Sequence, residues 1–527
     1  MSMLIRNATM ILPETTVIGD LLIVDGIITT IQPGGGLQPH DSNTQIIDAS
    51  GLHLLPGLID PQVHFRDPGQ PEKEDLHSGS CAAASGGITS FLDMPNNVPS
   101  QTTLQSMHNK LETADNRCVT NYGFFIGATE SNVEELQKAV GTPEAPIAIP
   151  GICGIKIFMG SSTGDLLVNE SNALKTIFDN TAGLIAVHAE DEDRMIERKK
   201  MIDGRTDMEA HAEWRDEETA LIATKRAVGY AQASGHRLHI LHLTSGIEAD
   251  WLHGLTSLTG TDGEAHITTE VLPQHLTFDE RDVAERGTRL KMNPPIRYQF
   301  DKETLWKRLH DDTIACIATD HAPHTLENKA KGFPKAHSGM PGVETSLPVM
   351  LTHASRGACT IEQVVKWMSL NVAKCYGMIG KGKLEQGYDG DVTLVDMTKE
   401  ILVEYCKDTV LHSTLHITFE ELLLHVFSRV QQNENKEEIK NNLSNDQIKN
   451  AEELKYKESD RLSVMSKGLL ECNIDSFLFD DGIEINGGKI SGGTIDSYGD
   501  HRIAMSFAIA GLISKDPITI LNTENVS

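Results

Sequence analysis

The fold and the site of this chain are best approached from one stretch, Ile59-Asp60-Pro61-Gln62-Val63-His64-Phe65-Arg66-Asp67-Pro68-Gly69. It follows the apolar run 52–58, so it is typical of a buried strand that opens into a loop. Side chains two residues apart on a strand point to the same side, which places Gln62 and His64 on one face with Arg66 just beyond. An imidazole and a guanidinium at a strand end suggest a metal site beside an anion-binding group.

Length and composition narrow the class of protein. The 527 residues are too many for one ordinary domain, and two or three are expected. A net charge of −29 repels phosphate backbones and disfavours nucleic-acid binding. The eight cysteines form no CxxC pair, which is typical of reduced thiols in the cytoplasm. We expect no membrane segment, since no run of about 18 apolar residues occurs.

The first 55 residues alternate apolar and polar side chains in short runs. Turn formers separate these runs at Asp25-Gly26 and at Pro33–Gly36. The pattern predicts a small antiparallel β unit, the first part of a β-sandwich. A similar run at Asp391–Asp396 could complete the same sheet, within about residues 380–397.

Between about residues 52 and 375 the pattern changes to β-rich runs separated by stretches long enough for helices. The runs are Leu54–His64, Ile88–Met94, Val119–Ala128, Ile152–Met159, Leu184–His188, Leu238–Leu243, His266–Leu272 and Ile314–Asp320. Eight such runs are the number that an α/β fold of the (β/α)8 TIM-barrel type needs, here over residues 56–379. Periodicity alone also suits a doubly wound sheet.

Polar residues at the run ends decide in favour of the barrel. Residues able to bind a metal or a substrate lie within, at or just after these runs, namely His64, Asn96, Lys156, His188, His242, Asp320 and His324. Barrel enzymes carry their chemistry at the C-terminal ends of the strands, so these side chains should converge at one rim.

The ligand types indicate a divalent metal. His64, His188, His242 and Asp320 form a nitrogen-and-oxygen set of the kind that holds zinc with an open position. A buried cationic Lys156 would be repelled by that metal and is costly to desolvate. If carbon dioxide adds to its amine, however, the resulting carbamate is an anionic ligand with two oxygens that can bridge two metals.

This arrangement favours hydrolysis of an amide. A metal activates water near neutral pH and polarises a carbonyl, while Asp320 can accept and return the proton. Arg66, Asn96 and His324 then form a cluster suited to a substrate carboxylate, with Arg66 offering a forked ion pair.

Two later stretches carry no candidate site residue, and the first of them is interpreted as scaffold. Thr360-Ile361-Glu362-Gln363 has the spacing of a capping box and should open an amphipathic helix that runs to about Met378. Residues 398–450 are an unmatched junction, and its polar end at Gln431–Asn450 is expected to be a linker or a solvated helix.

With these residues laid out, the chain resembles the dihydroorotases of the cyclic amidohydrolase group over about residues 1–397. The matching motifs are IDPQVHFRDPG, FLDMPNNVP, GIKIFMGSSTG, AVHAED, ILHLTS, KMNPPIR, ATDHAPH and GMPGVETSLP. The resemblance implies a (β/α)8 barrel with a flanking β-sandwich, and interconversion of N-carbamoyl-aspartate and dihydroorotate in pyrimidine synthesis. It implies metal ligands at His64, Lys156 as carbamate, His188, His242 and Asp320, the catalytic acid/base at Asp320, and substrate contacts at Arg66, Asn96, Asn293 and His324.

Gln62 is the main departure from that family, most of whose members have histidine there. A neutral amide is a weaker zinc ligand than imidazole, so one of two zinc ions should bind less tightly or be absent.

Residues 451–527 resemble part of the C-terminal half of enolpyruvylshikimate-phosphate synthase, through KESDRLSVMSKGL, ISGGTIDSYGDHRIAM and PITILNTENVS. The resemblance implies an α+β fragment and places five residues at that family's substrate site, namely Lys457, Glu458, Arg461, His501 and Arg502. The half that forms the opposite wall of the family's cleft does not occur in the chain. We therefore expect this fragment to lack transferase activity.

Two rival functions stay open at this point. A non-catalytic dihydroorotase-like subunit could serve as scaffold for aspartate carbamoyltransferase, and Gln62 motivates that alternative. An amidohydrolase for hydantoins or dihydropyrimidines is the other, although such substrates lack the carboxylate that Arg66 suits. Association with a second copy of the chain is a further expectation.

Overall fold

The computed structural model describes residues 2–160, 166–258, 266–398, 446–448, 460–479, 482–485, 491–498, 503–504, 507 and 516–523. The chain divides into two compact units, Met1–Thr414 and Leu415–Ser527. Within the described ranges, no helix has the length and apolar character needed to cross a membrane.

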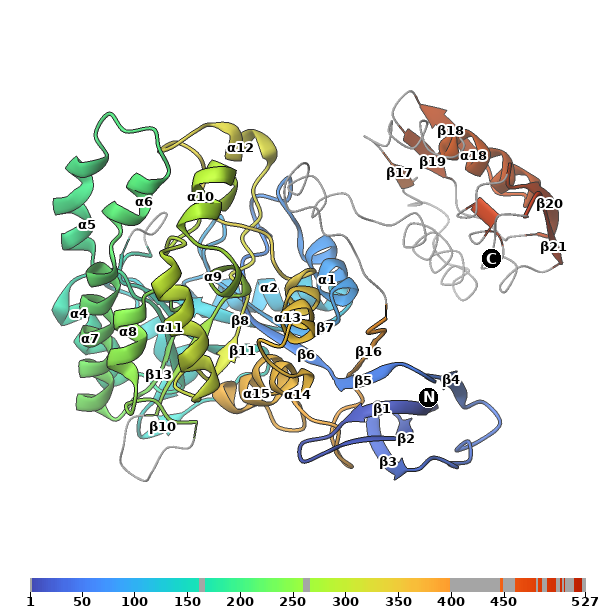
Figure 1. Cartoon of the computed structure of the whole chain (residues 1–527), viewed down its shortest axis with the longest axis horizontal. Helices are drawn as coiled ribbons and strands as arrows, with labels where there is room; N and C mark the ends of the chain where they lie inside the picture. The colour runs from blue at the N-terminus through green and yellow to red at the C-terminus, as the bar shows by residue number, and fades with distance from the viewer. Residues whose placement is uncertain are drawn as a thin grey trace. The chain divides into compact units, whose positions relative to one another are not determined.

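Eight parallel strands form the centre of the first unit (Figure 1). In sheet order they are β6 (Leu58–Val63), β7 (Ile88–Asp93), β8 (Asn121–Gly127), β11 (Ile152–Phe158), β12 (Leu184–His188), β13 (Arg237–Ile240), β14 (Ile267–Val271) and β15 (Cys316–Ile317). The last strand returns to the first through a parallel bridge between Val63 and His321. Backbone bonds there run from His64 N to His321 O over 2.7 Å and from His321 N to Gln62 O over 3.3 Å. The predicted (β/α)8 barrel is confirmed.

Helices follow the strands and surround them (Figure 1). They are α1 (Leu76–Ser85), α2 (Leu104–Arg117), α3 (Val133–Val140), α4 (Ser171–Asn180), α5 (Glu192–Arg198), α6 (Glu209–Trp214), α7 (Glu217–Ser234), α8 (Gly246–Leu252), α9 (Pro273–Thr277), α10 (Glu280–Arg286), α11 (Gln299–His310), α12 (Leu326–Ala330) and α13 (Ser346–Ser355), followed by α14 (Ile361–Val365) and α15 (Asn371–Tyr376). A single π-helical turn, Lys366–Leu370, joins α14 to α15, so the predicted helix from Thr360 is present and ends at Tyr376. Its capping box is also present, with Gln363 N donating to Thr360 Oγ1.

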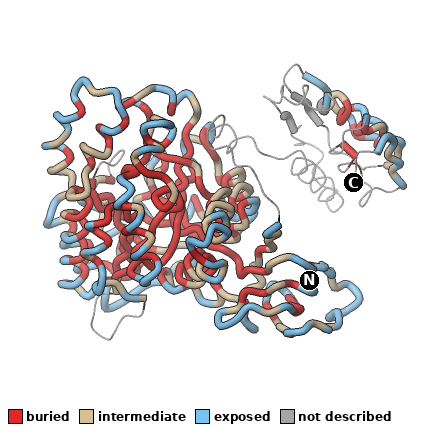
Figure 2. The backbone as a smooth tube through the Cα atoms, in the orientation of Figure 1, coloured by how far each residue is buried: buried red, intermediate tan, exposed pale blue. Residues whose placement is uncertain are grey.

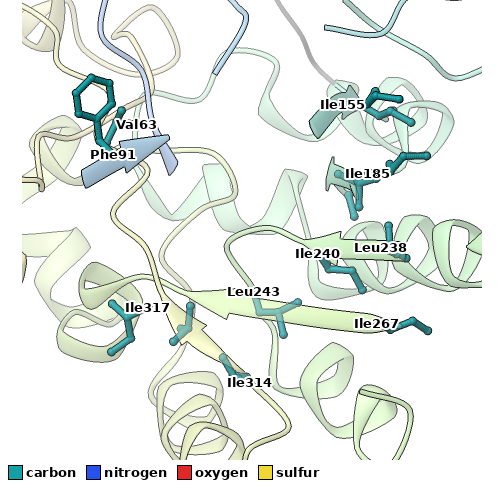
Figure 3. Close-up of a cluster of buried hydrophobic side chains, with 14 of the residues drawn as sticks. Val63, Phe91, Ile155, Ile185, Leu238, Ile240, Leu243, Ile267, Ile314 and Ile317 are labelled. Carbon is teal, nitrogen blue, oxygen red and sulfur yellow. The ribbon is translucent and has the colours of Figure 1, made fainter. Parts of the chain in front are cut away.

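The barrel strands are buried on both faces, and most of their buried side chains are apolar. Every residue of β12 is buried, as expected for a parallel strand covered on both sides. Figure 2 shows buried residues gathered in the interior of the first unit, and Figure 3 shows core side chains that include Val63 on β6 and Ile317 on β15. Each such side chain contributes roughly 1.5–3 kcal/mol when fully buried. This packing makes the strands a rigid base for the loops at their ends.

The N-terminal sheet consists of β1 (Ser2–Ile11), β2 (Thr16–Val24), β3 (Ile27–Pro33), β4 (Gln45–Asp48), β5 (His53–Pro56) and β16 (Val392–Val395). The predicted antiparallel pairing is only partly right, because β1 pairs in parallel with both β4 and β5. β16 pairs antiparallel with β5 and so brings a distant segment into this sheet.

The predicted strand Leu54–His64 is two strands in different sheets. β5 belongs to the N-terminal sheet and β6 to the barrel, and the break falls at Gly57. A Cβ at Gly57 would lie 2.2 Å from Thr89 Oγ1, so the chain passes too close to β7 for any larger residue. Continuous hydrophobicity hid this break, since both halves are buried.

In the second unit, β17 (Asp446–Ile448), β19 (Gly482–Ile485) and β18 (Ser476–Phe479) form an antiparallel sheet with α18 (Arg461–Glu471) nearby, and β20 (Gly493–Asp496) pairs in parallel with β21 (Ile518–Leu521). β17 lies within Gln431–Asn450, which was expected to be a linker or a solvated helix. That expectation is wrong for these three residues, which form a strand. Arg461 begins α18. The other residues implied at a transferase site, namely Lys457, Glu458, His501 and Arg502, lie outside the described residues, as does most of the junction 398–450.

Candidate active site

A cavity of about 870 Å³ opens at the carboxyl ends of the barrel strands. All nine barrel residues singled out from the sequence line it, namely His64, Arg66, Asn96, Lys156, His188, His242, Asn293, Asp320 and His324. Gln62 lines it as well. The expected convergence at one rim is therefore present.

His64 and Asp320 come from opposite ends of the sheet and meet where the barrel closes. His64 Nε2 lies 2.8 Å from Asp320 Oδ1. Gln62 Nε2 donates to the same carboxylate oxygen over 3.1 Å. The two closing backbone bonds between this strand and His321 hold these three side chains together.

Asn96 determines which nitrogen of His64 faces the cavity. The His64 Nδ1 atom lies 2.6 Å from Asn96 Oδ1, and since a carboxamide oxygen can only accept, Nδ1 carries the proton. The lone pair of a neutral His64 is therefore on Nε2, beside Asp320. This is the orientation that metal-binding imidazoles adopt, with the other ring nitrogen donating to a neighbouring oxygen.

His188 is oriented in the same way by a carboxylate. Its Nε2 donates to Glu190 Oε2 over 2.7 Å, while its Nδ1 lies 3.0 Å from His242 Nε2. Arg215 holds Glu190 through two bonds, one of them from Nε to Oε1 over 3.0 Å. Burial alone would raise the pKa of Glu190, but Arg215 and His188 hold it well below its usual range. Glu190 is therefore an anion that fixes the tautomer of His188.

Lys156 lies inside the barrel among these groups. Its side chain is 1% exposed, and Nζ has no hydrogen-bond partner but lies 4.5 Å from the centre of the Phe158 ring. Burial lowers the pKa of Lys156 to about 7, against the opposing charges of Asp320 and Glu270. An amine in this state is neutral for a large share of the time near neutral pH, and a neutral amine is a nucleophile.

Two site residues have a strained backbone. His242 has a φ of 38° and Asp320 a φ of 47°, in the left-handed region that residues other than glycine seldom adopt. Each follows the end of its strand, β13 or β15. Such strain costs about 1–3 kcal/mol per residue and is concentrated at functional sites, which supports a role for both side chains.

The cavity lining also offers hydrogen-bond donors. His211 Nε2 donates to Asn293 Oδ1 over 3.0 Å, which leaves the Asn293 amide nitrogen for a ligand. Asn96 likewise keeps its amide nitrogen free of the His64 contact. Arg66 Nε is buried without a partner. Together these groups suit an anion with several acceptor oxygens.

His324 lines the same cavity. Its Nε2 donates to the Ser338 carbonyl over 3.0 Å, and its Nδ1 is buried without a partner. Burial, together with the charges of Arg66 and Lys73, lowers the pKa of His324 to about 2. A neutral His324 thus presents an acceptor to the cavity. Gly339 allows this packing, since it has a φ of 141° and a Cβ there would lie 2.5 Å from Ala322 O.

The residues present fit a metal ion. Three polar atoms near the His64–Asp320 pair are buried without partners, namely Gln62 Oε1, Lys156 Nζ and His242 Nδ1. Two of them offer a lone pair directly, and the third would offer oxygens once carbamylated. With His64, His188 and Asp320 they form a donor set of the zinc type.

A second group with metal-ligand chemistry lies elsewhere in the barrel. Ligand atoms of His239, Glu270 and Cys316 are within 4.8 Å of one another. His239 Nε2, however, bonds Glu270 over 3.0 Å and its Nδ1 bonds Thr268 over 2.7 Å, so both ring nitrogens are satisfied. None of these residues lines the large cavity. We interpret the group as a buried hydrogen-bond network.

Sequence reasoning missed the residues that support the site. His211 and Arg215 lie on or next to α6, away from any strand end, so the rule that located the other residues did not apply to them. Glu190 does follow a strand, within the quoted motif AVHAED, and could have been identified as a carboxylate two residues beyond His188.

Comparisons with known proteins match two families to different parts of the chain. The profile of the amidohydrolase family matches residues 53–435, and that of EPSP synthase (3-phosphoshikimate 1-carboxyvinyltransferase) matches residues 438–527. A dihydroorotase of Methanosarcina mazei is 33% identical over 382 residues, which are 72% of this chain and 81% of the relative. A dihydroorotase of Pediococcus pentosaceus is 34% identical over 410 residues, 76% and 90% of the two chains.

Other relatives bear different names. An allantoinase of Streptomyces avermitilis is 32% identical over 400 residues, which are 75% of this chain and 86% of the relative. Among solved structures, the L-hydantoinase (dihydropyrimidinase) from Arthrobacter aurescens superposes with a TM-score of 0.67 at 28% identity, covering 74% of this chain and 86% of that one.

Proposed function

The chain belongs to the amidohydrolase family, and we propose that it is a metal-dependent dihydroorotase that interconverts N-carbamoyl-aspartate and dihydroorotate. The observation that carries this proposal is that one cavity is lined both by a metal-ligand set and by a buried guanidinium. His64 lies against Asp320 in it, and Arg66 lines the same cavity with its Nε atom unpartnered.

The cation would be zinc, as one or two ions. His64, His188, His242 and Asp320 would hold it, together with the carbamate of Lys156. The buried Nζ of Lys156 has no hydrogen-bond partner, which supports its carbamylation. The added carboxylate would replace the unpartnered amine with two oxygens that can bind the metal. When bound, the ion supplies polarisation of the amide carbonyl and activation of water near neutral pH.

Asp320 is the proton carrier in this proposal. In the hydrolytic direction, water oxygen adds to the ring carbonyl carbon and the ring C–N bond breaks. The proton lost by water passes to the Asp320 carboxylate and then to the departing nitrogen. Gln62 and the strained backbone at Asp320 hold this carboxylate in place. Cyclisation follows the same steps in reverse.

The substrate carboxylate would lie against Arg66. A guanidinium can pair with both of its oxygens, and the free amide nitrogens of Asn96 and Asn293 supply further donors. The unpartnered Nδ1 of His324 would accept the ring N–H next to the carboxylate carbon. Arg66, Asn96, Asn293 and His324 thereby each gain a partner from one ligand.

The test is hydrolysis of dihydroorotate and of dihydrouracil by the purified chain, with and without Arg66→Met. We expect dihydroorotate to be the better substrate, and Arg66→Met to lower its kcat/KM by at least about 100-fold while changing dihydrouracil turnover little. Arg356→Met, which removes an exposed arginine, is the matched control. Equal loss on both substrates would contradict the assignment of the carboxylate to Arg66.

A hydantoinase or dihydropyrimidinase activity is the second candidate, and the structural likeness to the Arthrobacter enzyme favours it. Preference for dihydrouracil over dihydroorotate would support it. The third candidate function is that of a non-catalytic scaffold for aspartate carbamoyltransferase. If the wild-type chain shows neither bound metal nor turnover, the scaffold is the only one of the three candidate functions that is left.

For the second unit we propose no transferase activity. Only about 90 residues, 438–527, match the enolpyruvyl transferase, and a fragment without the facing wall of its cleft does not enclose two substrates. Phosphate release from shikimate 3-phosphate and phosphoenolpyruvate would contradict this. We also propose a cytoplasmic location, which fits the free cysteines of the described residues.

A further inference from the structure

Lys73 is a cation on the cavity wall that the proposed chemistry does not yet use. Its side chain is only 8% exposed and lines the cavity together with Arg66. Nζ donates to Gln70 Oε1 over 3.0 Å. Within residues 2–160, 166–258 and 266–398, no carboxylate forms an ion pair with it. An ammonium has three donors, so two remain for a ligand.

The loop that carries Lys73 is held in place. Its backbone bonds run from Arg66 N to Glu74 O over 3.2 Å, from Gln70 N to Arg66 O over 2.9 Å, and from Lys73 N to Gln70 O over 3.0 Å. Arg117, the last residue of α2, forms an ion pair with Asp67 of this loop, over 2.5 Å between Nη1 and Oδ2. Arg66 and Lys73 are therefore presented together on a fixed segment, which limits the entropy lost on binding.

Like charges gather around Lys73 in a protein that is acidic overall. The pKa of Lys73 is lowered first by burial and then by the charge of Arg66, while Glu72 opposes this and Lys331 adds to it. Lys73 in turn lowers the pKa of both His324 and His337, after burial. Neighbouring cations whose charges act on one another in this way repel, and an anion bound between them relieves the repulsion.

We infer that Lys73 is a specificity-determining residue that contacts the carboxylate of the substrate beside Arg66. This rests on the proposed function. The two cations on one loop would select cyclic amides that carry a ring carboxylate, and they would disfavour neutral rings of the same size. Arg66 provides the planar fork, and Lys73 provides a second, unforked donor to the same group.

The experiment compares Lys73→Met with wild type on dihydroorotate and on its neutral methyl ester, using the full chain loaded with zinc. Loss of one charge-assisted hydrogen bond should raise KM for dihydroorotate about 10- to 100-fold, with a much smaller change in kcat. The methyl ester should be affected little. Calorimetric titration with orotate gives a readout that does not depend on turnover, and its Kd should rise by a similar factor. Lys73→Arg should recover most of the loss.

Lys331→Met is the matched control. Lys331 is exposed, bonds Asn328 and does not line the cavity, yet its charge acts on Lys73. If KM for dihydroorotate rises equally in Lys73→Met and Lys331→Met, the effect is long-range and the inference is overturned. The inference is also overturned if the wild type hydrolyses dihydroorotate and Lys73→Met leaves KM and the affinity for orotate unchanged. A wild type that neither binds orotate nor hydrolyses dihydroorotate would instead overturn the proposed function, and this inference with it.

Discussion

Gln62 donates its side-chain amide to Asp320, over 3.1 Å between Nε2 and Oδ1. The other end of the same amide, Oε1, is buried without a hydrogen-bond partner. Gln62 therefore both holds the proposed proton carrier and offers the cavity a neutral oxygen. Since a neutral amide oxygen is a weaker ligand for zinc than an imidazole, this pairing favours one tightly held ion over two.

Gln62→His should raise the number of tightly bound zinc ions per chain. An imidazole at this position can ligate through a nitrogen, so a second ion should survive dialysis that removes it from the wild type. Elemental analysis of the dialysed proteins measures the ratio, with Gln105→His on the exposed face of α2 as control. Identical zinc content in the three proteins would show that Gln62 does not limit the metal count.

Glu190→Gln should weaken zinc binding by about 10- to 100-fold, because His188 loses the carboxylate that orients its ring. It should also destabilise the barrel by about 3–5 kcal/mol, since Arg215 is left as a buried unpaired charge. Competition with a zinc chelator and urea unfolding measure the two effects.

Adding Arg215→Met to Glu190→Gln separates them. The double variant should regain much of the lost stability, but not the zinc affinity. Recovery of both would mean that Glu190 acts on the fold alone and not on His188.

Most of this site could be predicted from the sequence because one rule applies to it. Strands of a parallel barrel end at the same rim, so polar residues after apolar runs had to converge there, as His64, His188 and His242 do. The rule says nothing of the loops and helices beyond the rim. His211 acts from α6 and Arg215 from the residue after it, and only coordinates relate them to Asn293 and Glu190.

The fold shows the same division. Apolar runs located the barrel strands within a few residues, yet they did not show that 54–64 serves two sheets. The break at Gly57 depends on the close approach of β7, a contact between distant parts of the chain. Parallel pairing of β1 with β4 and β5 was missed for a similar reason, since alternation predicts a strand but not its partner.

Glu248→Gln should make the barrel more stable at pH 8 and leave it nearly unchanged at pH 4.5. Burial raises the pKa of Glu248 to about 7, although a bond from Thr224 opposes this. The folded state thus binds a proton more tightly than the unfolded state, and wild type loses stability as pH rises from about 4.5 to about 7. The loss from this group is about 3 kcal/mol.

Urea unfolding followed by tryptophan fluorescence measures this difference, because all four tryptophans belong to the first unit. Glu303→Gln on the exposed side of α11 is the control. A stability gap between Glu248→Gln and wild type that does not change with pH would contradict the assignment.

Gly229→Ala should stabilise the barrel by about 0.5–1 kcal/mol. Gly229 is exposed in the middle of α7, and a Cβ there would meet no atom within 4 Å. Gly339→Ala is the opposite case, because its positive φ and the nearby Ala322 carbonyl exclude a side chain. Thermal unfolding of the two variants should therefore shift in opposite directions, and a loss of stability in Gly229→Ala would contradict the open space beside Gly229.

The most direct test of the central claim is a single preparation of the wild-type chain analysed for zinc and assayed with dihydroorotate. The account predicts at least one zinc ion per chain, together with hydrolysis that a chelator abolishes and added zinc restores. Metal-free protein that does not become active when zinc is supplied would contradict it.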